Sequence, residues 1–195
     1  MTGAEISGLE REFLRELIGK DPDCCHEFNY GAMLRYLNEY FGLEFDLPLQ
    51  RQEAILWDAC SPGVPVPHIA ELLDFLWERG VRTGVISNLC FTEKTLRDRI
   101  DRGLPRHHFE FMISTMEYGV RKPSRRIFEL ALRKAGVPAE RAWFCGNDPV
   151  CDAEGAANAG LRAFWYTGTL RGERRLPRCE YTEITDWAEM IELLR

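Results

Sequence analysis

The sequence predicts an α/β protein in which a doubly wound parallel sheet follows a helical segment. Three observations lead to this fold class. Residues 1–60 carry only helical periodicity, the residues after 67 alternate between helix-like and strand-like segments, and "CSPGVPVP" at 60–67 separates the two parts. Strands that are separated by helices form parallel βαβ units. We therefore expect a helical segment over residues 1–62 and an α/β core over residues 63–195.

The helical segment contains stripes of apolar residues at helical spacing. The clearest stripe predicts one amphipathic helix, and it consists of Tyr30, Met33, Leu34, Leu37 and Phe41. A similar stripe precedes it, and its members are Ile6, Leu9, Phe13 and Leu17. A weaker stripe follows it, and its members are Leu49, Ile55, Leu56 and Ala59. Residues 1–60 are therefore predicted to be helical, and residues 1–20 offer no good strand.

The core segment supplies the strands and the remaining helices. The first helix of the core begins near Ile69 and ends at Gly80, where glycine stops the helical pattern. The predicted strands are 81–87, 109–114, 142–146 and 161–167. The predicted helices between and after them are 92–102, 125–136, an alanine-rich helix after the third strand, and a last helix that begins at Asp186 with Glu189 as its capping box.

Composition and charge exclude several classes of protein. The net charge of −6 argues against a nucleic-acid surface. Seven scattered cysteines without a Cys-x-x-Cys pair indicate free thiols in a reducing cytoplasm. The acidic N-terminus lacks the apolar region of a signal peptide, and no apolar run approaches the ~18 residues of a membrane span. We expect a cytoplasmic protein without a nucleic-acid or membrane partner.

Three of the predicted strands end in polar residues, and ligands of such sheets bind at the carboxyl ends of the strands. The strand "VIS" is followed by Asn88, so that Ser87 and Asn88 stand just before a helix. A hydroxyl group and free backbone N–H groups in that position can bind phosphate. The same residues can also form an ordinary turn or helix cap.

The other two strand ends carry a lysine and an acidic loop. In "YGVRKPS", Pro123 suits the first position of a helix and keeps Lys122 out of helical geometry. In "GNDPVCD", Asp148 and Asp152 lie four residues apart beside Asn147. Hard oxygen ligands suit Mg²⁺, which accepts one or two protein carboxylates. One of the two aspartates could instead cap the alanine-rich helix.

A hydroxyl, a lysine and an acidic loop on successive strand ends resemble the haloacid dehalogenase superfamily. Ser87 matches its second motif, Lys122 before Pro123 its third, and Asp148 and Asp152 its fourth. The resemblance implies a phosphatase-like hydrolase in which residues 1–62 form a C1-type helical cap on the core of residues 63–195. Ser87, Asn88 and Lys122 would bind the phosphate group of a small metabolite, Ser87 and Lys122 would assist catalysis, and Asp148, Asp152 and Asn147 would hold Mg²⁺.

One motif of that superfamily is not found in the printed sequence. The superfamily places its nucleophile in an Asp-x-Asp-x-Thr motif on a central first strand ahead of the cap. The only Asp-x-Asp here is "DPD" at 21–23, which follows no apolar strand and precedes no threonine. Asn147 also occupies a position where many members carry an aspartate. Mg²⁺ is therefore expected to bind weakly or not at all.

The function has three candidate interpretations at this stage. The chain could be a phosphohydrolase whose first strand was lost through a wrong start codon or a truncated gene. It could also be a non-catalytic relative that binds a phosphorylated ligand or a protein, and a receiver-like phosphorelay domain is a third option. Without the central strand, either segments 82–86 and 142–146 pair directly or a segment of this chain or of a neighbouring molecule inserts between them. We expect direct pairing, and we expect the protein to be prone to self-association as a homo-oligomer.

Overall fold

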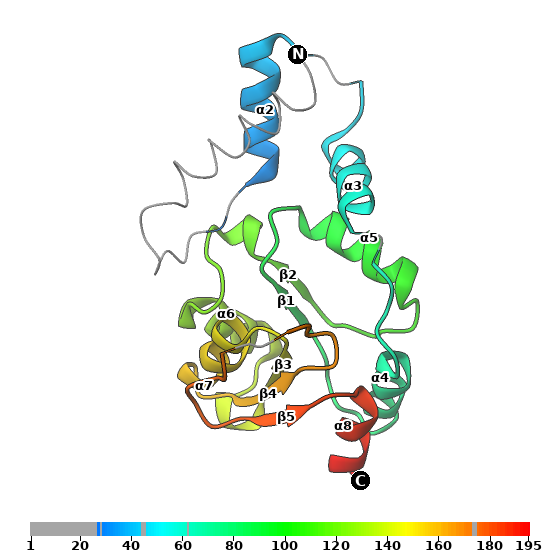
Figure 1. Cartoon of the computed structure of the whole chain (residues 1–195), viewed down its shortest axis with the longest axis vertical. Helices are drawn as coiled ribbons and strands as arrows, with labels where there is room; N and C mark the ends of the chain where they lie inside the picture. Colours follow the sequence, from blue (N-terminus) through cyan, green and yellow to red (C-terminus); the bar gives the residue numbers. More distant parts are fainter. Residues whose placement is uncertain (1–26, 28, 44–45, 62, 173–174) are drawn as a thin grey trace.

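The computed structural model of the chain describes residues 27, 29–43, 46–61, 63–172 and 175–195 (Figure 1). The predicted helix over Ile6 to Leu17 and the "DPD" segment lie outside the described residues. The predicted fold class is confirmed, because all strand pairs in the described residues are parallel and helices pack on the sheet. No helix of the described part is long and apolar enough to cross a membrane.

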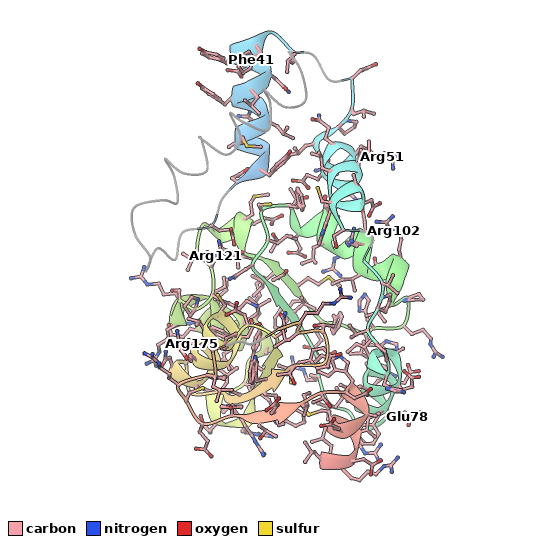
Figure 2. The ribbon with its side chains drawn as sticks, in the orientation of Figure 1. Phe41, Arg51, Glu78, Arg102, Arg121 and Arg175 are labelled. Carbon is pink, nitrogen blue, oxygen red and sulfur yellow. The ribbon has the colours of Figure 1, made fainter. Side chains whose placement is uncertain are left out.

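The helices between residues 30 and 60 lie at one end of the molecule and the C-terminal helix lies at the other (Figure 1). Helix α2 (Tyr30–Phe41) begins at Asn29, whose side chain accepts a hydrogen bond from the Ala32 N–H. It ends at Gly42, whose φ of 62° lies in the left-handed region that glycine adopts without strain. Figure 2 shows Phe41 at the end of α2 that is farthest from the sheets.

Helix α3 (Leu49–Cys60) packs against α5 (Glu93–Gly103) of the core through a buried carboxylate. The fully buried Glu53 accepts hydrogen bonds from the Thr92 N–H and from the Thr92 and Thr95 hydroxyls. Near the end of α3, Asp58 forms ion pairs with two arginines of α5, Arg99 and Arg102. A buried carboxylate is stable when its oxygens are bonded in this way, so α3 is fixed to the core.

The strands form two separate parallel sheets in the described residues. Strand β1 (Val85–Ser87) pairs with β2 (Met112–Ser114), so that Ser87 lies beside Ser114. The second sheet has the order β3 (Trp143–Gly146), β4 (Arg162–Tyr166) and β5 (Thr182–Ile184). The expected direct pairing of segments 82–86 and 142–146 is wrong, because β1 and β3 belong to different sheets.

Helices cover both faces of the larger sheet. On one face, Ala163 and Trp165 of β4 pack with residues of α6 (Arg125–Ala135), α7 (Gly155–Asn158) and the π-helical turn η3 (Pro149–Glu154). On the other face, Phe164 and Tyr166 pack with α4 (Ile69–Glu78) and α8 (Trp187–Leu193). The apolar run of β4 is therefore buried on both sides, as is usual for parallel strands. Two short 3₁₀ turns, η1 (Thr115–Tyr118) and η2 (Ala139–Arg141), complete the core.

Candidate functional site

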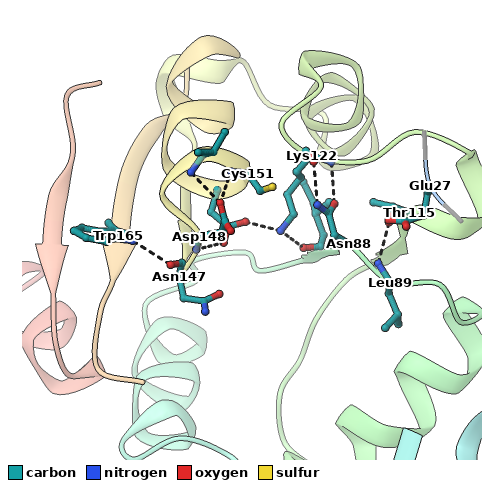
Figure 3. Close-up of polar contacts among 12 residues, drawn as sticks. Glu27, Asn88, Leu89, Thr115, Lys122, Asn147, Asp148, Cys151 and Trp165 are labelled. Carbon is teal, nitrogen blue, oxygen red and sulfur yellow. Dashed lines mark hydrogen bonds and ion pairs between the residues drawn. The ribbon is translucent and has the colours of Figure 1, made fainter. Parts of the chain in front are cut away.

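The buried Lys122 is the centre of the site that the strand ends predicted (Figure 3). Its side chain is 9% exposed, and Nζ donates to Asp152 Oδ1 at 2.6 Å and to the Ile86 carbonyl oxygen at 3.1 Å. The ammonium also lies 4.9 Å from the centre of the Phe144 ring. A buried cation is costly unless it is paired and hydrogen-bonded, and these contacts meet that requirement.

The side chain of Asn88, the residue after Ser87, forms two hydrogen bonds with the backbone of Lys122. The Asn88 Nδ2 donates to the Lys122 carbonyl oxygen at 2.9 Å, and the Lys122 N–H donates to Asn88 Oδ1 at 2.8 Å. Ile86 and Asn88, the sequence neighbours of Ser87, therefore both bind Lys122. The structure thus places the predicted site residues Ser87 and Lys122 next to each other. The expectation that Pro123 starts the following helix is wrong, because α6 begins at Arg125 after Ser124.

The acidic loop after β3 is organised by its two aspartates. Asp148 caps η3, since its Oδ1 accepts hydrogen bonds from the Val150 and Cys151 N–H groups. Asp152 joins the loop to the lysine, since its Oδ2 accepts from the Asp148 N–H at 2.8 Å while Oδ1 accepts from Lys122. The expectation that one of the two aspartates caps a helix is thus confirmed for Asp148, whereas Asp152 is the ion-pair partner of Lys122.

Gly146 is the residue that allows Asp152 to approach the end of β3. A Cβ atom at position 146 would lie 2.3 Å from the Asp152 Cγ and Oδ2 atoms, well inside a van der Waals contact. The loop backbone is also fixed from the next strand, because Trp165 Nε1 donates to the Asn147 carbonyl oxygen at 3.1 Å. The ion pair therefore depends on glycine at the end of β3.

The acidic loop offers Mg²⁺ the carboxylate oxygens that it prefers, but few of these oxygens are available to a metal ion. No group of three or more His, Cys, Asp or Glu side chains among them is placed to hold a metal ion. Both oxygens of Asp152 are engaged by Lys122 and the loop backbone, and Oδ1 of Asp148 is engaged in capping. The side-chain amide of Asn147 points away from Lys122 in Figure 3. Of the four carboxylate oxygens of Asp148 and Asp152, Oδ2 of Asp148 is the one that none of these contacts engages, so it could bind a metal ion.

Four residues of the site surroundings were not predicted from the sequence. Thr115 accepts a hydrogen bond from the Leu89 N–H and donates to Glu27, while the neighbouring Ser114 donates to the Phe91 carbonyl oxygen. Glu27, which is almost fully buried, also pairs with Arg121 at 3.4 Å. These contacts fix the loop after Ser87, and the polar end of the strand "MIST" was the signal that could have indicated them.

Two cysteines near the site are too weakly acidic to act as nucleophiles. Burial raises the pKa of the Cys145 thiol to about 12. Burial, together with the charges of Asp148 and Asp152, raises the pKa of the Cys151 thiol to about 11, although Arg121 and Lys122 oppose this shift. The thiolate is the reactive form of cysteine, so both groups remain protonated and inert at neutral pH.

These pKa values predict a selective pattern of thiol alkylation. At pH 8, iodoacetamide should modify the exposed Cys60 much faster than Cys145 or Cys151, because Cys60 is accessible and the other two carry almost no thiolate. Peptide mass spectrometry at successive times measures the three rates, and urea-unfolded protein is the control in which they should converge. Fast modification of Cys151 in the folded protein would contradict the buried placement of this loop.

Comparison with known proteins identifies the family. The family model for haloacid dehalogenase-like hydrolases matches residues 4–160. The chain therefore belongs to the haloacid dehalogenase-like hydrolase family, as the motifs had indicated. Crystal structures show the same fold: those of a phosphatase of this family from Thermococcus onnurineus and of an L-2-haloacid dehalogenase each superpose with a TM-score of 0.65. They are 22% and 21% identical to this chain, and the matches cover 94% and 95% of it and 78% and 80% of those chains.

Curated relatives include both phosphatases and a dehalogenase. The glyceraldehyde 3-phosphate phosphatase of Methanothermobacter thermautotrophicus is 35% identical over 134 residues, which cover 67% of this chain and 58% of the relative. The (S)-2-haloacid dehalogenase of a Pseudomonas species is 25% identical over 199 residues, covering 98% and 82%. The chain spans little more than half of the length of the phosphatase relatives from Methanothermobacter thermautotrophicus and Pyrococcus furiosus.

Proposed function

We propose that the chain is a phosphatase-type member of its family that binds the phosphate group of a small phosphorylated metabolite beside Ser87 and Lys122. The observation that carries the proposal is the position of Lys122 between the two sequence neighbours of Ser87. This position puts a buried cation and a hydroxyl group at the carboxyl ends of parallel strands, where the ligands of such sheets bind. The phosphatase relative at 35% identity supports the same class of substrate.

The chemistry of the site follows from its charges and donors. A lysine ammonium has three N–H donors, and two of those of Lys122 are given to Asp152 and Ile86. The third can be donated to a phosphate oxygen, and the Ser87 hydroxyl can orient a second oxygen. Because Lys122 is fixed by Asp152 and Asn88 before any ligand binds, this stabilisation needs little reorganisation. Mg²⁺, when bound through Asp148, would neutralise further charge on the phosphate group.

A second candidate is a phosphate-binding protein without catalysis. The observation that favours it is the absence of an Asp-x-Asp-x-Thr motif from the printed sequence, which leaves these 195 residues without the nucleophile that the resemblance implies. The other residues would still bind and orient a phosphate group, because neither Ser87 nor Lys122 needs the nucleophile for that purpose. Phosphate binding therefore tests the site that the two candidates share.

The 195-residue chain is expected to hydrolyse an aryl phosphate at no measurable rate, with or without Mg²⁺. Loss of a covalent nucleophile lowers turnover on the order of a millionfold. The assay follows release of the aryl alcohol at high protein concentration, and heat-treated protein from the same preparation serves as the control. Turnover that is lost in both the Lys122→Ala and Asp148→Ala variants would contradict this expectation, since it would reveal a working site made of other residues.

A further inference from the structure

The loop of residues 88–92 joins Ser87 at the end of β1 to helix α5, and each of its residues forms a hydrogen bond with a residue outside the loop (Figure 3). The partners, in the order of the loop residues, are Lys122, Thr115, Tyr30, Ser114 and Glu53. Segments with few contacts are the ones that open most easily. A loop that is bound at every residue is therefore expected to be rigid.

Helices α2 and α3 both contact this loop. The Tyr30 N–H at the start of α2 donates to the Cys90 carbonyl oxygen at 3.1 Å. The centre of the Phe91 ring lies 5.3 Å from that of the Tyr30 ring and 5.3 Å from that of the Trp57 ring of α3. The loop that follows Ser87 therefore packs against both helices.

Glu53 of α3 binds Thr92, the last residue of the loop. Its fully buried carboxylate accepts hydrogen bonds from the Thr92 N–H at 3.1 Å and from the Thr92 hydroxyl group at 2.6 Å. That hydroxyl group also accepts a hydrogen bond from the Thr95 N–H at 3.3 Å, as the N-cap of α5. Loss of the carboxylate would leave buried donors without an acceptor, which is costly. Glu53 therefore fixes the point at which the loop ends and α5 begins.

A second carboxylate of α3 binds α5 without binding the loop. Asp58 forms ion pairs with Arg99 at 2.6 Å and with Arg102 at 3.1 Å, and its side chain is 43% exposed. Both arginines lie beyond the first turn of α5. Asp58 and Glu53 thus both attach α3 to the core, but of these two carboxylates only Glu53 binds the loop of residues 88–92.

We propose that Glu53 is a positioning residue for the phosphate site, at which it acts from helix α3 through the loop. Its bonds to Thr92 fix the loop of residues 88–92, and the loop in turn fixes the Ser87 hydroxyl group and the Asn88 side chain. A chain of hydrogen bonds in a rigid segment can carry such coupling between two places in a protein. The inference rests on the proposed function, because it concerns the same phosphate site.

The test compares Glu53→Ala with Asp58→Ala in the full 195-residue chain, with inorganic phosphate as the ligand and nuclear magnetic resonance titration as the measurement. Glu53→Ala should weaken phosphate binding about fivefold or more, the usual size of a coupling between sites. Asp58→Ala should change the affinity by less than about twofold, because its ion pairs are partly exposed and do not include the loop. Glu53→Gln keeps the size of the side chain and one acceptor oxygen, so its affinity should lie between the two. It provides the comparison if Glu53→Ala does not fold.

Hydrogen exchange without phosphate separates positioning from a general loss of stability. The Lys122 N–H is donated to Asn88 Oδ1, at the opposite end of the loop from Glu53. It should exchange faster in the Glu53 variants than in Asp58→Ala, compared in urea concentrations that give equal global stability. Unchanged phosphate affinity in the Glu53 variants, or an equal loss in Asp58→Ala, would overturn the positioning role. A wild-type chain that binds no phosphate would refute the phosphate site itself, and the positioning role with it, before any variant is compared.

Discussion

The Lys122→Met variant is expected to lose about 3–5 kcal/mol of unfolding free energy, because it leaves the Asp152 carboxylate buried without its cation. Asp152 is 6% exposed at its side chain, and Lys122 is its ion-pair partner at 2.6 Å. The same substitution removes the donor of the Ile86 carbonyl oxygen. Urea unfolding followed by circular dichroism measures the loss.

A matched surface lysine provides the control for this variant. Lys94 pairs with Asp98 on α5, but both side chains are more than half exposed, so Lys94→Met should change stability by less than about 1 kcal/mol. Adding Asp152→Asn to Lys122→Met should restore part of the lost stability, since the uncompensated charge is then removed. Equal effects of the two lysine substitutions would show that the buried ion pair stabilises the protein no more than the exposed pair does.

The Gly146→Ala variant is expected to lose about 1–3 kcal/mol and most of its affinity for phosphate, because the new methyl group overlaps Asp152. The Cβ would lie 2.3 Å from two atoms of that carboxylate. Asp152 cannot retreat without breaking its bonds to Lys122 and to the Asp148 N–H. Thermal unfolding and phosphate titration of the same sample measure both effects.

Gly103→Ala is the matched control for the glycine substitution. Gly103 is the exposed last residue of α5, and its Cβ would meet only the ring of Pro65 at 3.3 Å. Alanine in a compatible helical position is neutral or stabilises by about 0.4–1 kcal/mol. If the two alanine variants behaved alike, the close approach of Asp152 to β3 would not matter for the site.

Much of the fold was predictable because helical periodicity and apolar strands are local signals. The stripe from Tyr30 to Phe41 forms α2 at those residues, and the predicted strand over 161–167 forms β4. Strand β5 was missed because Thr182–Ile184 is short and places two polar residues before its one apolar residue, which is too weak a signal for a strand. The last helix follows Asp186 as predicted, but Glu189 bonds to Thr185 and not to the Asp186 N–H.

The parts of the site that could not be predicted are those that depend on contacts distant in sequence. Spacing placed Ser87, Lys122 and the acidic loop at neighbouring strand ends, and the structure brings Lys122 against Ile86, Asn88 and Asp152. The sequence did not show that Asp152, and not Asp148, pairs with the lysine. Direct pairing of β1 and β3 was the wrong expectation, because the side chains of Lys122 and Asp152 span the space between them.

Mapping of inorganic phosphate binding by nuclear magnetic resonance tests the central claim most directly. Titration of the ¹⁵N-labelled chain should shift the amides of Ser87, Asn88 and Lys122 together, with one dissociation constant. The Ser87→Ala variant, which keeps the ion pair of Lys122 with Asp152, should bind phosphate more weakly at the same residues. Shifts confined to the basic segment around Arg171, Arg175 and Arg178, or unchanged affinity in Ser87→Ala, would contradict a phosphate site at these strand ends.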